Sequence, residues 1–301
     1  MRKNSIAKAF LPIMAVFLVQ NAMAFIGMEL MLMDKIKNFD GGSYTNLMES
    51  WMEGVQEASF TVWVSICYTI ICGIWFSVWY YRLRHNKQHI SGISDVGEVA
   101  SEIKKEKVFE GYRLTIIPGL VMLAAGLQYL CTYLMNFLST LFPEWLVNYE
   151  KLMENIGLDS VDSYTVPLIV YTVFLGPIVE ELTFRGLTFT YARRATGFLG
   201  ANILQAVLFG FLHMNPLQGI YAAALGFVFG IIYEKSRNIL VTIGLHILFN
   251  LAGTFLSAYM QLGDNMISFY FIVFGSLIVT YIGYELTVKS IPQRVEIEEK
   301  F

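Results

Sequence analysis

Long, continuously apolar runs dominate the chain. A hydrocarbon core of roughly 30 Å is crossed by about 20 apolar helical residues, and eight runs approach that length. They lie at about 10–33, 58–81, 114–141, 165–191, 199–213, 217–233, 239–260 and 266–286. None alternates with the period of two that the strands of a membrane barrel would show. The pattern therefore predicts an all-α, polytopic membrane protein, a bundle of about eight transmembrane helices.

Basic residues gather in every second connection between these runs. If the N-terminus faces inward, the inner segments hold 17 of the 21 Lys and Arg residues, and the outer loops hold Lys35, Lys37 and Lys151. Positive charge marks the cytoplasmic side of a membrane protein. We therefore expect a multi-pass integral membrane protein with both termini in the cytoplasm, in the plasma membrane if the source is prokaryotic.

Two segments of this arrangement leave a choice open. The first run follows Arg2-Lys3 and contains Ala22-Met23-Ala24, as a cleavable signal peptide would, yet it continues to Met33 and is long enough to span. We expect a retained anchor. The long inner connection at 82–113 predicts either an amphipathic surface helix near its end, from Ile103 to Tyr112, or a solvated loop.

Composition agrees with the bilayer and excludes several classes of protein. Of 301 residues 55% are apolar and 15% charged, with a mean hydropathy of +0.54, so two soluble domains are excluded and one integral membrane domain over 1–301 is expected. The net charge of −3 offers no basic surface for a nucleic acid, which we exclude as a partner. The three cysteines, Cys67, Cys72 and Cys131, form no disulfide framework and support no thiol catalysis.

Three charged residues interrupt the fourth run. Glu180, Glu181 and Arg185 stand in an otherwise apolar helix, where each charge costs roughly 2.5–3.5 kcal/mol. At 100° per residue Glu181 and Arg185 lie about 40° apart and suit an ion pair, whereas Glu180 lies about 140° from Arg185. The spacing predicts an ionised Glu181 beside its cation and a Glu180 suited to general-base chemistry, unless another helix brings Glu180 a cation. The alternative is a salt bridge that only packs helices.

Two histidines also lie inside apolar runs. His213 follows Phe209 by one helical turn, and His246 precedes Asn250 by one turn. Phe209 can line a pocket, and Asn250 can donate a hydrogen bond. A single membrane histidine is usually an interhelical hydrogen-bonding group, but two of them with an amide and two carboxylates indicate a common site. Next along the chain, Asn215-Pro216 predicts a cap and first-turn proline at the start of the sixth helix.

These residues form a recognisable set of motifs. Glu180-Glu181 followed by Arg185, Phe209 followed by His213, and His246 followed by Asn250 resemble the three-motif signature of the CPBP family. This family comprises the CAAX protease and bacteriocin-processing proteins, also called Abi, and includes the type II CAAX prenyl endopeptidases. The motif-bearing core covers 165–260, whereas the first three runs carry no signature.

The resemblance implies a fold, an activity and residue roles. The fold would be eight helices around a conical cavity open to the cytoplasm, and the activity a glutamate-dependent peptide hydrolysis without a covalent intermediate, cofactor or metal. Glu180 would activate water that His213 helps to hold, while His246 and Asn250 would stabilise the oxyanion. The supporting residues would be Glu181, Arg185 and Phe209. The substrate would be a membrane-associated or lipidated peptide or protein; its identity and the oligomeric state stay open.

Three other functions remain compatible with these residues. Glu180, His213 and His246 could instead bind zinc, with a metal-bound hydroxide as nucleophile, although no His-Glu-x-x-His helix is present. The same polar cluster could tie helices together in a non-enzymatic scaffold or a bacteriocin-immunity protein. A proton-coupled carrier would also use intramembrane Glu and His, but the chain shows no internal repeat that would favour it.

Overall fold

The computed structural model describes residues 2–85, 109–256, 259–260 and 262–292. Every regular element in these residues is helical, as predicted. The helices longer than one turn are α1 (Arg2–Lys37), α2 (Tyr44–Gln56), α3 (Ala58–His85), α4 (Ile116–Leu141), α5 (Pro143–Ile156), η4 (Val170–Leu175), α7 (Gly176–Glu181), η5 (Leu182–Phe189), α8 (Thr190–Leu212), α9 (Pro216–Ser236), α10 (Ile239–Phe255) and α11 (Met266–Ser290). Two single turns, η3 (Val161–Ser163) and α6 (Val166–Ile169), precede η4.

The helices confirm a multi-pass membrane protein. Among the described residues, six helical stretches are long and apolar enough to cross a bilayer. The fourth, Val166–Leu212, contains two of the predicted runs in 47 residues, and the run predicted at 239–260 is the 17-residue helix Ile239–Phe255. Eight crossings and a conical cavity therefore stay predictions. The sequence patterns did not indicate α2 and α5, and the surface helix expected at Ile103 to Tyr112 lies mostly outside the described residues.

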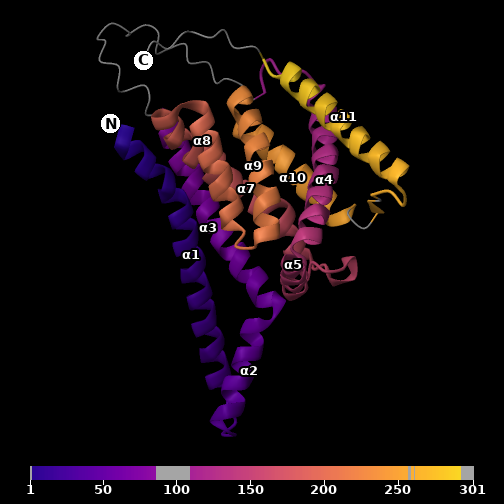
Figure 1. Ribbon diagram of the computed structural model, residues 1–301. Coiled ribbons are helices and arrows are strands. Elements are labelled where there is room, and N and C mark those ends of the chain that lie inside the picture. Colours follow the sequence, from indigo (N-terminus) through magenta and orange to yellow (C-terminus); the bar gives the residue numbers. More distant parts are fainter. Residues whose placement is uncertain (1, 86–108, 257–258, 261, 293–301) are drawn as a thin grey trace, which may run out of the picture.

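The 47-residue stretch is too long for one straight crossing, and it folds back. At about 1.5 Å per residue it would extend roughly 70 Å. Gly197 interrupts it with φ 77° and ψ −173°, a backbone conformation that glycine adopts readily. Arg185 and Gln205 both donate to the carbonyl of Gly226 although they stand twenty positions apart in the chain. The arms before and after Gly197 therefore pack beside the same helix, α9 (Figure 1).

The two ends of the described chain lie at one end of the bundle. The start of α1 and the end of α11 are both at the top of Figure 1. The start of α4 joins them, because the N–H of Arg113 donates to the carbonyl of Ser290 at 3.0 Å. A chain whose two ends lie at the same end of the bundle crosses the membrane an even number of times. α1 and α3 flank one side of the central helices α8, α9 and α10, and α4 with α11 flanks the other (Figure 1).

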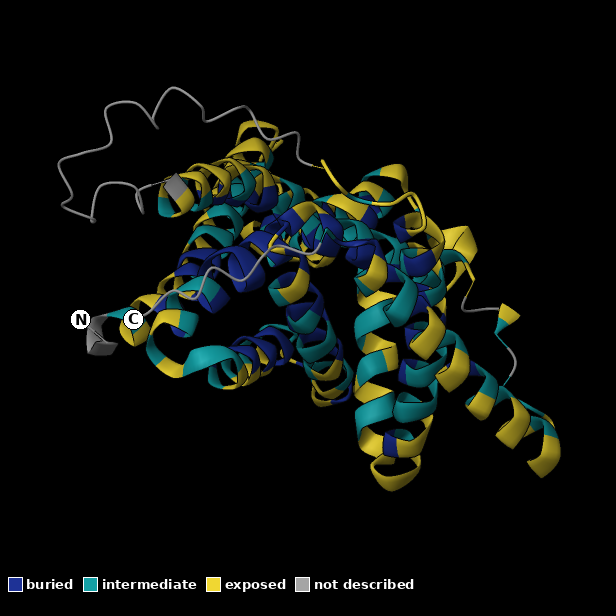
Figure 2. Ribbon diagram, turned by 90° about the horizontal axis from the view of Figure 1, so that it is seen from above, coloured by how far each residue is buried: buried dark blue, intermediate teal, exposed yellow. Residues whose placement is uncertain are grey.

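Apolar side chains cover the outside of the bundle as well as its core. Buried residues gather where helices meet, and exposed residues form the outer faces (Figure 2). Many of the exposed side chains are large and apolar, among them Leu114, Ile267 and Phe271, which are 80% exposed or more. Such surfaces are stable against lipid tails and would aggregate in water. The exposed faces therefore agree with a bilayer around the helices.

Candidate active site

The two adjacent carboxylates lie in a short α-helix between two π-helical segments. α7 contains Pro177 in its first turn and Glu180 and Glu181 in its last, with η4 before it and η5 after it. π turns are rare and occur mostly at functional sites. Their wider spacing shifts backbone hydrogen bonds and so makes carbonyl oxygens accessible to side chains of neighbouring helices.

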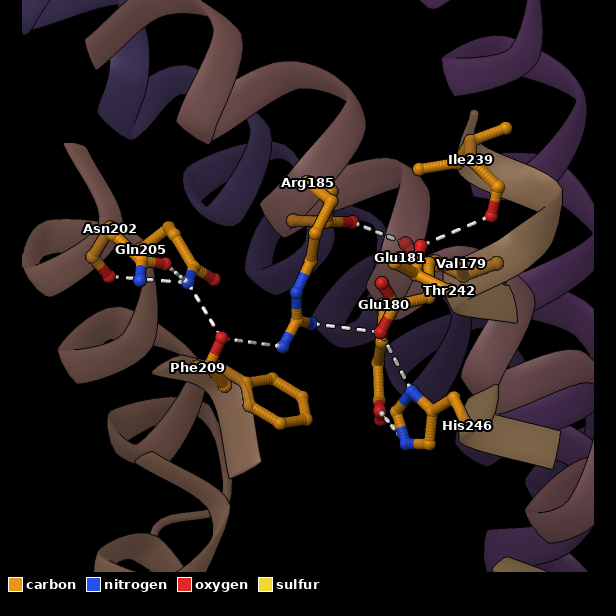
Figure 3. A network of polar contacts seen from close by, with 12 residues as sticks. Val179, Glu180, Glu181, Arg185, Asn202, Gln205, Phe209, Ile239, Thr242 and His246 are labelled. Carbon is orange, nitrogen blue, oxygen red and sulfur yellow. Dashed lines mark hydrogen bonds and ion pairs between the residues drawn. The ribbon is translucent and has the colours of Figure 1, made fainter. Parts of the chain in front are cut away.

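Glu181 is completely buried and is held from two sides. Its Oε1 accepts a hydrogen bond from Arg185 Nη1 at 2.9 Å, the ion pair that the four-residue spacing predicts. The same oxygen lies 2.9 Å from His246 Nδ1, sixty-five positions away on α10 (Figure 3). Two donors on one carboxylate oxygen stabilise the ionised form. Glu181 therefore connects η5 to α10 as an acceptor of hydrogen bonds.

Arg185 is equally buried and reaches across the bundle. Besides Glu181, it donates from Nη2 to the carbonyl of Gly226 on α9 at 3.3 Å. Its guanidinium carbon lies 4.7 Å from the centre of the Phe209 ring and 5.2 Å from that of Phe229. Aromatic faces attract a desolvated cation. Arg185 is thus enclosed by one carboxylate, one carbonyl and two phenyl rings.

Glu180 differs from its neighbour in exposure. Its side chain is 23% exposed whereas that of Glu181 is 0% exposed, and its Oε2 lies 3.5 Å from His246 Nε2. The imidazole of His246 is therefore placed between the two carboxylates, with one ring nitrogen toward each (Figure 3). The sequence left open whether another helix would bring Glu180 a cation. The structure brings it His246, whose imidazole is a cation only when protonated.

His213 joins the cluster through an aromatic ring. It lies at the C-terminal end of α8, where its Nδ1 is 2.9 Å from the carbonyl of Phe209. The Phe209 ring makes edge contacts with both imidazoles, at centre distances of 5.0 Å to His213 and 5.8 Å to His246. The predicted cap at Asn215, which accepts from the N–H of Gln218 at the start of α9, holds the turn that follows.

Asn250 binds a backbone carbonyl of a π-helical segment. Its Nδ2 donates to Thr172 O in η4 at 2.8 Å. An amide nitrogen carries two N–H groups, so this bond occupies one of them. The hydrogen bond fastens α10 to η4, two turns before Glu180 in the same span. The residues predicted as a site therefore lie in one region. Pairwise contacts link Glu180, Glu181, Arg185, Phe209 and His246, and the other two lie at its margin.

Two buried amides that the sequence analysis did not consider support this cluster. Gln205 and Asn202 are both 0% exposed. Gln205 Nε2 donates to the Gly226 carbonyl oxygen that Arg185 also uses, at 2.8 Å (Figure 3). Asn202 Nδ2 donates to Phe227 O at 3.0 Å. Two amides three residues apart in an apolar run were the available signal, because such a pair must find polar partners inside the protein.

The described residues do not bring Glu180, His213 and His246 together as the three ligands of a zinc ion. Within 2–85, 109–256, 259–260 and 262–292, no three or more His, Cys, Asp or Glu side chains are grouped as they would be to hold a metal ion. His246 already engages Glu181 and Glu180 with its two nitrogens, and His213 engages a backbone carbonyl.

Comparison with a protein-family model points to the same part of the chain. Residues 162–252 match the family model described as "Type II CAAX prenyl endopeptidase Rce1-like". A protein of Bacillus subtilis (strain 168) named "Putative membrane peptidase YdiL" is 31% identical over 93 residues. That match covers 31% of this chain but only 38% of the relative. No solved structure matches the chain.

Proposed function

The chain belongs to the CPBP family of CAAX proteases through this segment, and from that premise we propose that it is an intramembrane, glutamate-dependent endopeptidase. It would hydrolyse a peptide bond of a membrane-associated or lipidated peptide with an activated water. The difference between the adjacent carboxylates carries the proposal: Glu181 is sealed by Arg185 and His246, whereas Glu180 keeps 23% exposure beside the same imidazole.

The first chemical step assigns Glu180 as general base. Glu180 accepts a proton from water while the water oxygen attacks the carbonyl carbon of the scissile bond. Glu181 is an acceptor for Arg185, so His246 Nδ1 carries the hydrogen that bonds to it, and Nε2 is left as an acceptor toward Glu180. The protonated Glu180 can then donate to Nε2, which orients the acid for delivery of the proton to the leaving amine.

The remaining polar groups have supporting roles in this proposal. The oxyanion of the tetrahedral intermediate needs hydrogen-bond donors in a site that excludes bulk water. The second N–H of Asn250 would supply one donor. Nε2–H of His246 would supply another while the imidazole holds the proton that Glu180 took from water, before that proton returns to Glu180 for the leaving amine. His213, in edge contact with Phe209, would hold the water before attack. Arg185 acts through Glu181 and is a positioning residue.

The site also suggests where the substrate lies. Lys and Arg dominate the segments at the end of the bundle that holds the start of α1 and the end of α11. By the positive-inside distribution this end is cytoplasmic, so both termini lie in the cytoplasm, and in a prokaryote the membrane is the plasma membrane. The substrate is a peptide or protein that reaches the cluster from the lipid phase or from that surface.

A pair of isosteric substitutions tests the assignment. Glu180→Gln and Glu181→Gln each remove one carboxylate from the same helix. Purified full-length protein in lipid nanodiscs would be assayed with quenched fluorescent peptides that carry prenylated or unmodified C-termini. We expect Glu180→Gln to lower turnover by about 10²–10⁴-fold with an unchanged unfolding temperature. Glu181→Gln should lower both. Normal turnover by Glu180→Gln would refute Glu180 as the base.

The buried ion pair also suits a second function. Glu181 and Arg185 are both 0% exposed and join η5 to α9 and α10, as in a scaffold or immunity protein whose polar cluster only holds helices together. In that case Glu180→Gln and Glu181→Gln would change the unfolding temperature, and neither wild type nor variant would cleave any peptide of the set. Peptide cleavage that is lost in Glu180→Gln would favour the endopeptidase over the scaffold or immunity protein.

A further inference from the structure

Two parallel helical stretches run in register from the candidate active site to the end of the bundle. Arg185 in η5 contacts Gly226 in α9, and Arg193 in α8 contacts Glu234 in α9. Both contacts join residues forty-one positions apart. The stretch 185–193 therefore lies beside 226–234 for about two turns. The contact between Arg193 and Glu234 therefore helps to hold Arg185 beside Gly226.

The second pair belongs to a group of charges that we name the rim cluster: Arg193, Glu234 and Arg237. Glu234 Oε1 accepts from Arg193 Nε at 3.2 Å and Nη2 at 3.1 Å, and from Arg237 Nη2 at 2.8 Å. The arginine side chains are 36% and 47% exposed, against 17% for the glutamate. A guanidinium has five N–H donors, so one carboxylate oxygen leaves most of this donor capacity to the surroundings.

Positive charge around the rim cluster is in excess. The described ends of α3, α8 and α9 that meet here carry six basic side chains and one acidic side chain, Glu234. The basic residues are Arg82, Arg84, Arg193, Arg194, Lys235 and Arg237. Arg84 is connected to α9 through hydroxyls, because its Nη1 donates to Tyr80 OH at 3.3 Å and that hydroxyl lies 3.2 Å from Tyr233 OH. The excess charge therefore spans three helices.

Aromatic side chains indicate the depth of the cluster in the bilayer. Trp79 Nε1 donates to Tyr191 OH at 3.0 Å, and the guanidinium of Arg194 lies 5.7 Å from the centre of the Tyr191 ring. Trp and Tyr concentrate at the headgroup level of membranes. Beyond the Gly197 turn the apolar side chain of Leu199 is 59% exposed. Donors for an anion and an exposed apolar side chain that could contact an acyl chain thus lie within a few residues of each other in the chain.

We propose that the rim cluster binds the phosphate group of an anionic phospholipid headgroup. Arg193 and Arg237 would share the phosphate oxygens as they share Glu234 Oε1, since guanidinium groups bind phosphate with paired hydrogen bonds. The lipid is the favoured source of phosphate because it is permanently present at this depth, whereas a free anion must be recruited from solution. Bound lipid joins α8 to α9 and thereby stabilises the contact between Arg185 and Gly226 two turns away.

Lipid-dependent stability of the full chain tests this proposal. The variant Arg193→Gln/Arg237→Gln removes two charges from the cluster, and Arg113→Gln/Lys289→Gln removes two from the same end of the bundle, near Ser290. Unfolding temperatures would be compared in nanodiscs of phosphatidylcholine and of phosphatidylcholine with phosphatidylglycerol. We expect phosphatidylglycerol to raise the midpoint by about 4 °C in wild type and control. The cluster variant should lose this shift.

Each other outcome contradicts the proposal. Equal loss in both double variants would mean a general effect of surface charge, and an unchanged shift in the cluster variant would exclude the cluster. The same stabilisation of lipid-free protein in neutral detergent by inorganic phosphate, or by a soluble phosphoserine peptide, would exclude a lipid as the specific ligand. If the double variant does not fold, Arg237→Gln alone, in which Arg193 still pairs with Glu234, is compared with Lys289→Gln by the same measurement.

Discussion

In the pair of α4 and α11, backbones meet directly at glycines. In the group of η5, α8, α9 and α10, glycine contacts also occur, between Gly210 and Gly219, but buried polar side chains in addition reach the backbone of the next helix. A Cβ added at Gly283 of α11 would lie 2.8 Å from Leu123 Cα in α4. In the polar group, Gly226 O accepts from both Arg185 and Gln205. Close packing and interhelical hydrogen bonds are the two ways by which helices associate in lipid.

The difference shows why, among the described residues, the fully buried charges Glu181 and Arg185 occur in only one part of the bundle. A buried charge or amide is costly in lipid unless each of its groups finds a partner. Glycine contacts give adhesion without that cost, and α4 and α11 use them. Around Glu180 the polar groups stabilise the helices and also supply the proposed chemistry. Changes at the fully buried members of the polar group should therefore affect stability and activity together, and changes between α4 and α11 should affect stability alone.

The largest effect is expected from Arg185→Met. It leaves Glu181 as a buried charge with only His246 as partner, and breaking a buried pair by removing one member costs about 3–5 kcal/mol. The free energy of unfolding in detergent and the rate of peptide cleavage would both be measured. The double variant Glu181→Leu/Arg185→Met, which removes both charges, should recover most of the stability but not the activity. A double variant less stable than Arg185→Met would contradict this account of the pair.

A smaller loss is expected from Gly283→Ala in the glycine-packed pair. The added methyl group would meet the backbone of Leu123, which cannot move aside as a side chain can, so the helices must separate at a cost of about 2–3 kcal/mol. Gly275→Ala on the same helix is the control, since nothing lies within 4 Å of its added Cβ. Turnover per folded molecule should stay at the wild-type value in both. Reduced turnover in Gly283→Ala would mean that α4 and α11 also shape the site.

Gly230→Ala adds a methyl group within the polar group of η5, α8, α9 and α10, as Gly283→Ala does between α4 and α11. Its Cβ would lie 2.7 Å from Gln205 Nε2 and closer still to Asn202 Oδ1, so both amides must leave their carbonyl partners. We expect a loss of about 2 kcal/mol for these two hydrogen bonds, together with lower turnover. Gly244→Ala on α10, with nothing within 4 Å, should change neither quantity. If Gly230→Ala loses stability but keeps its turnover, Asn202 and Gln205 stabilise the helices without affecting the active site.

The smallest effect is expected from Gln205→Leu. The change removes one of two donors to Gly226 O and keeps Arg185 in place, so about 1 kcal/mol should be lost. Turnover should fall only a few-fold, with the loss in kcat rather than in KM because Arg185 acts on the reacting groups through Glu181. Equal kinetics of wild type and Gln205→Leu at matched folded concentration would show that Arg185 holds its position without this amide.

Much of the fold could be predicted because it depends on local pattern. Each of the eight apolar runs falls largely on helical elements, although the run at 239–260 extends beyond α10, and Asn215 caps α9 as its position before Pro216 predicts. The pair of Glu181 and Arg185 also follows from spacing, since residues four apart meet on any α-helix. The sequence predicted that these helices share a site, but not which atoms meet between them. Nothing in the spacing relates His246 to Glu180, or Asn250 to Thr172 O.

The sequence by itself determined that the chain is helical and multi-pass, which acid pairs with Arg185, and which seven residues to examine. These properties depend on hydropathy and on the helical period, and both act between near neighbours. The tertiary structure alone decided that Glu180 and Glu181 share one imidazole, and that Gly197 turns the chain so that Arg185 and Gln205 meet at one carbonyl. Such contacts depend on how whole helices pack, because burial in lipid requires each polar group to find a partner wherever in the chain it lies.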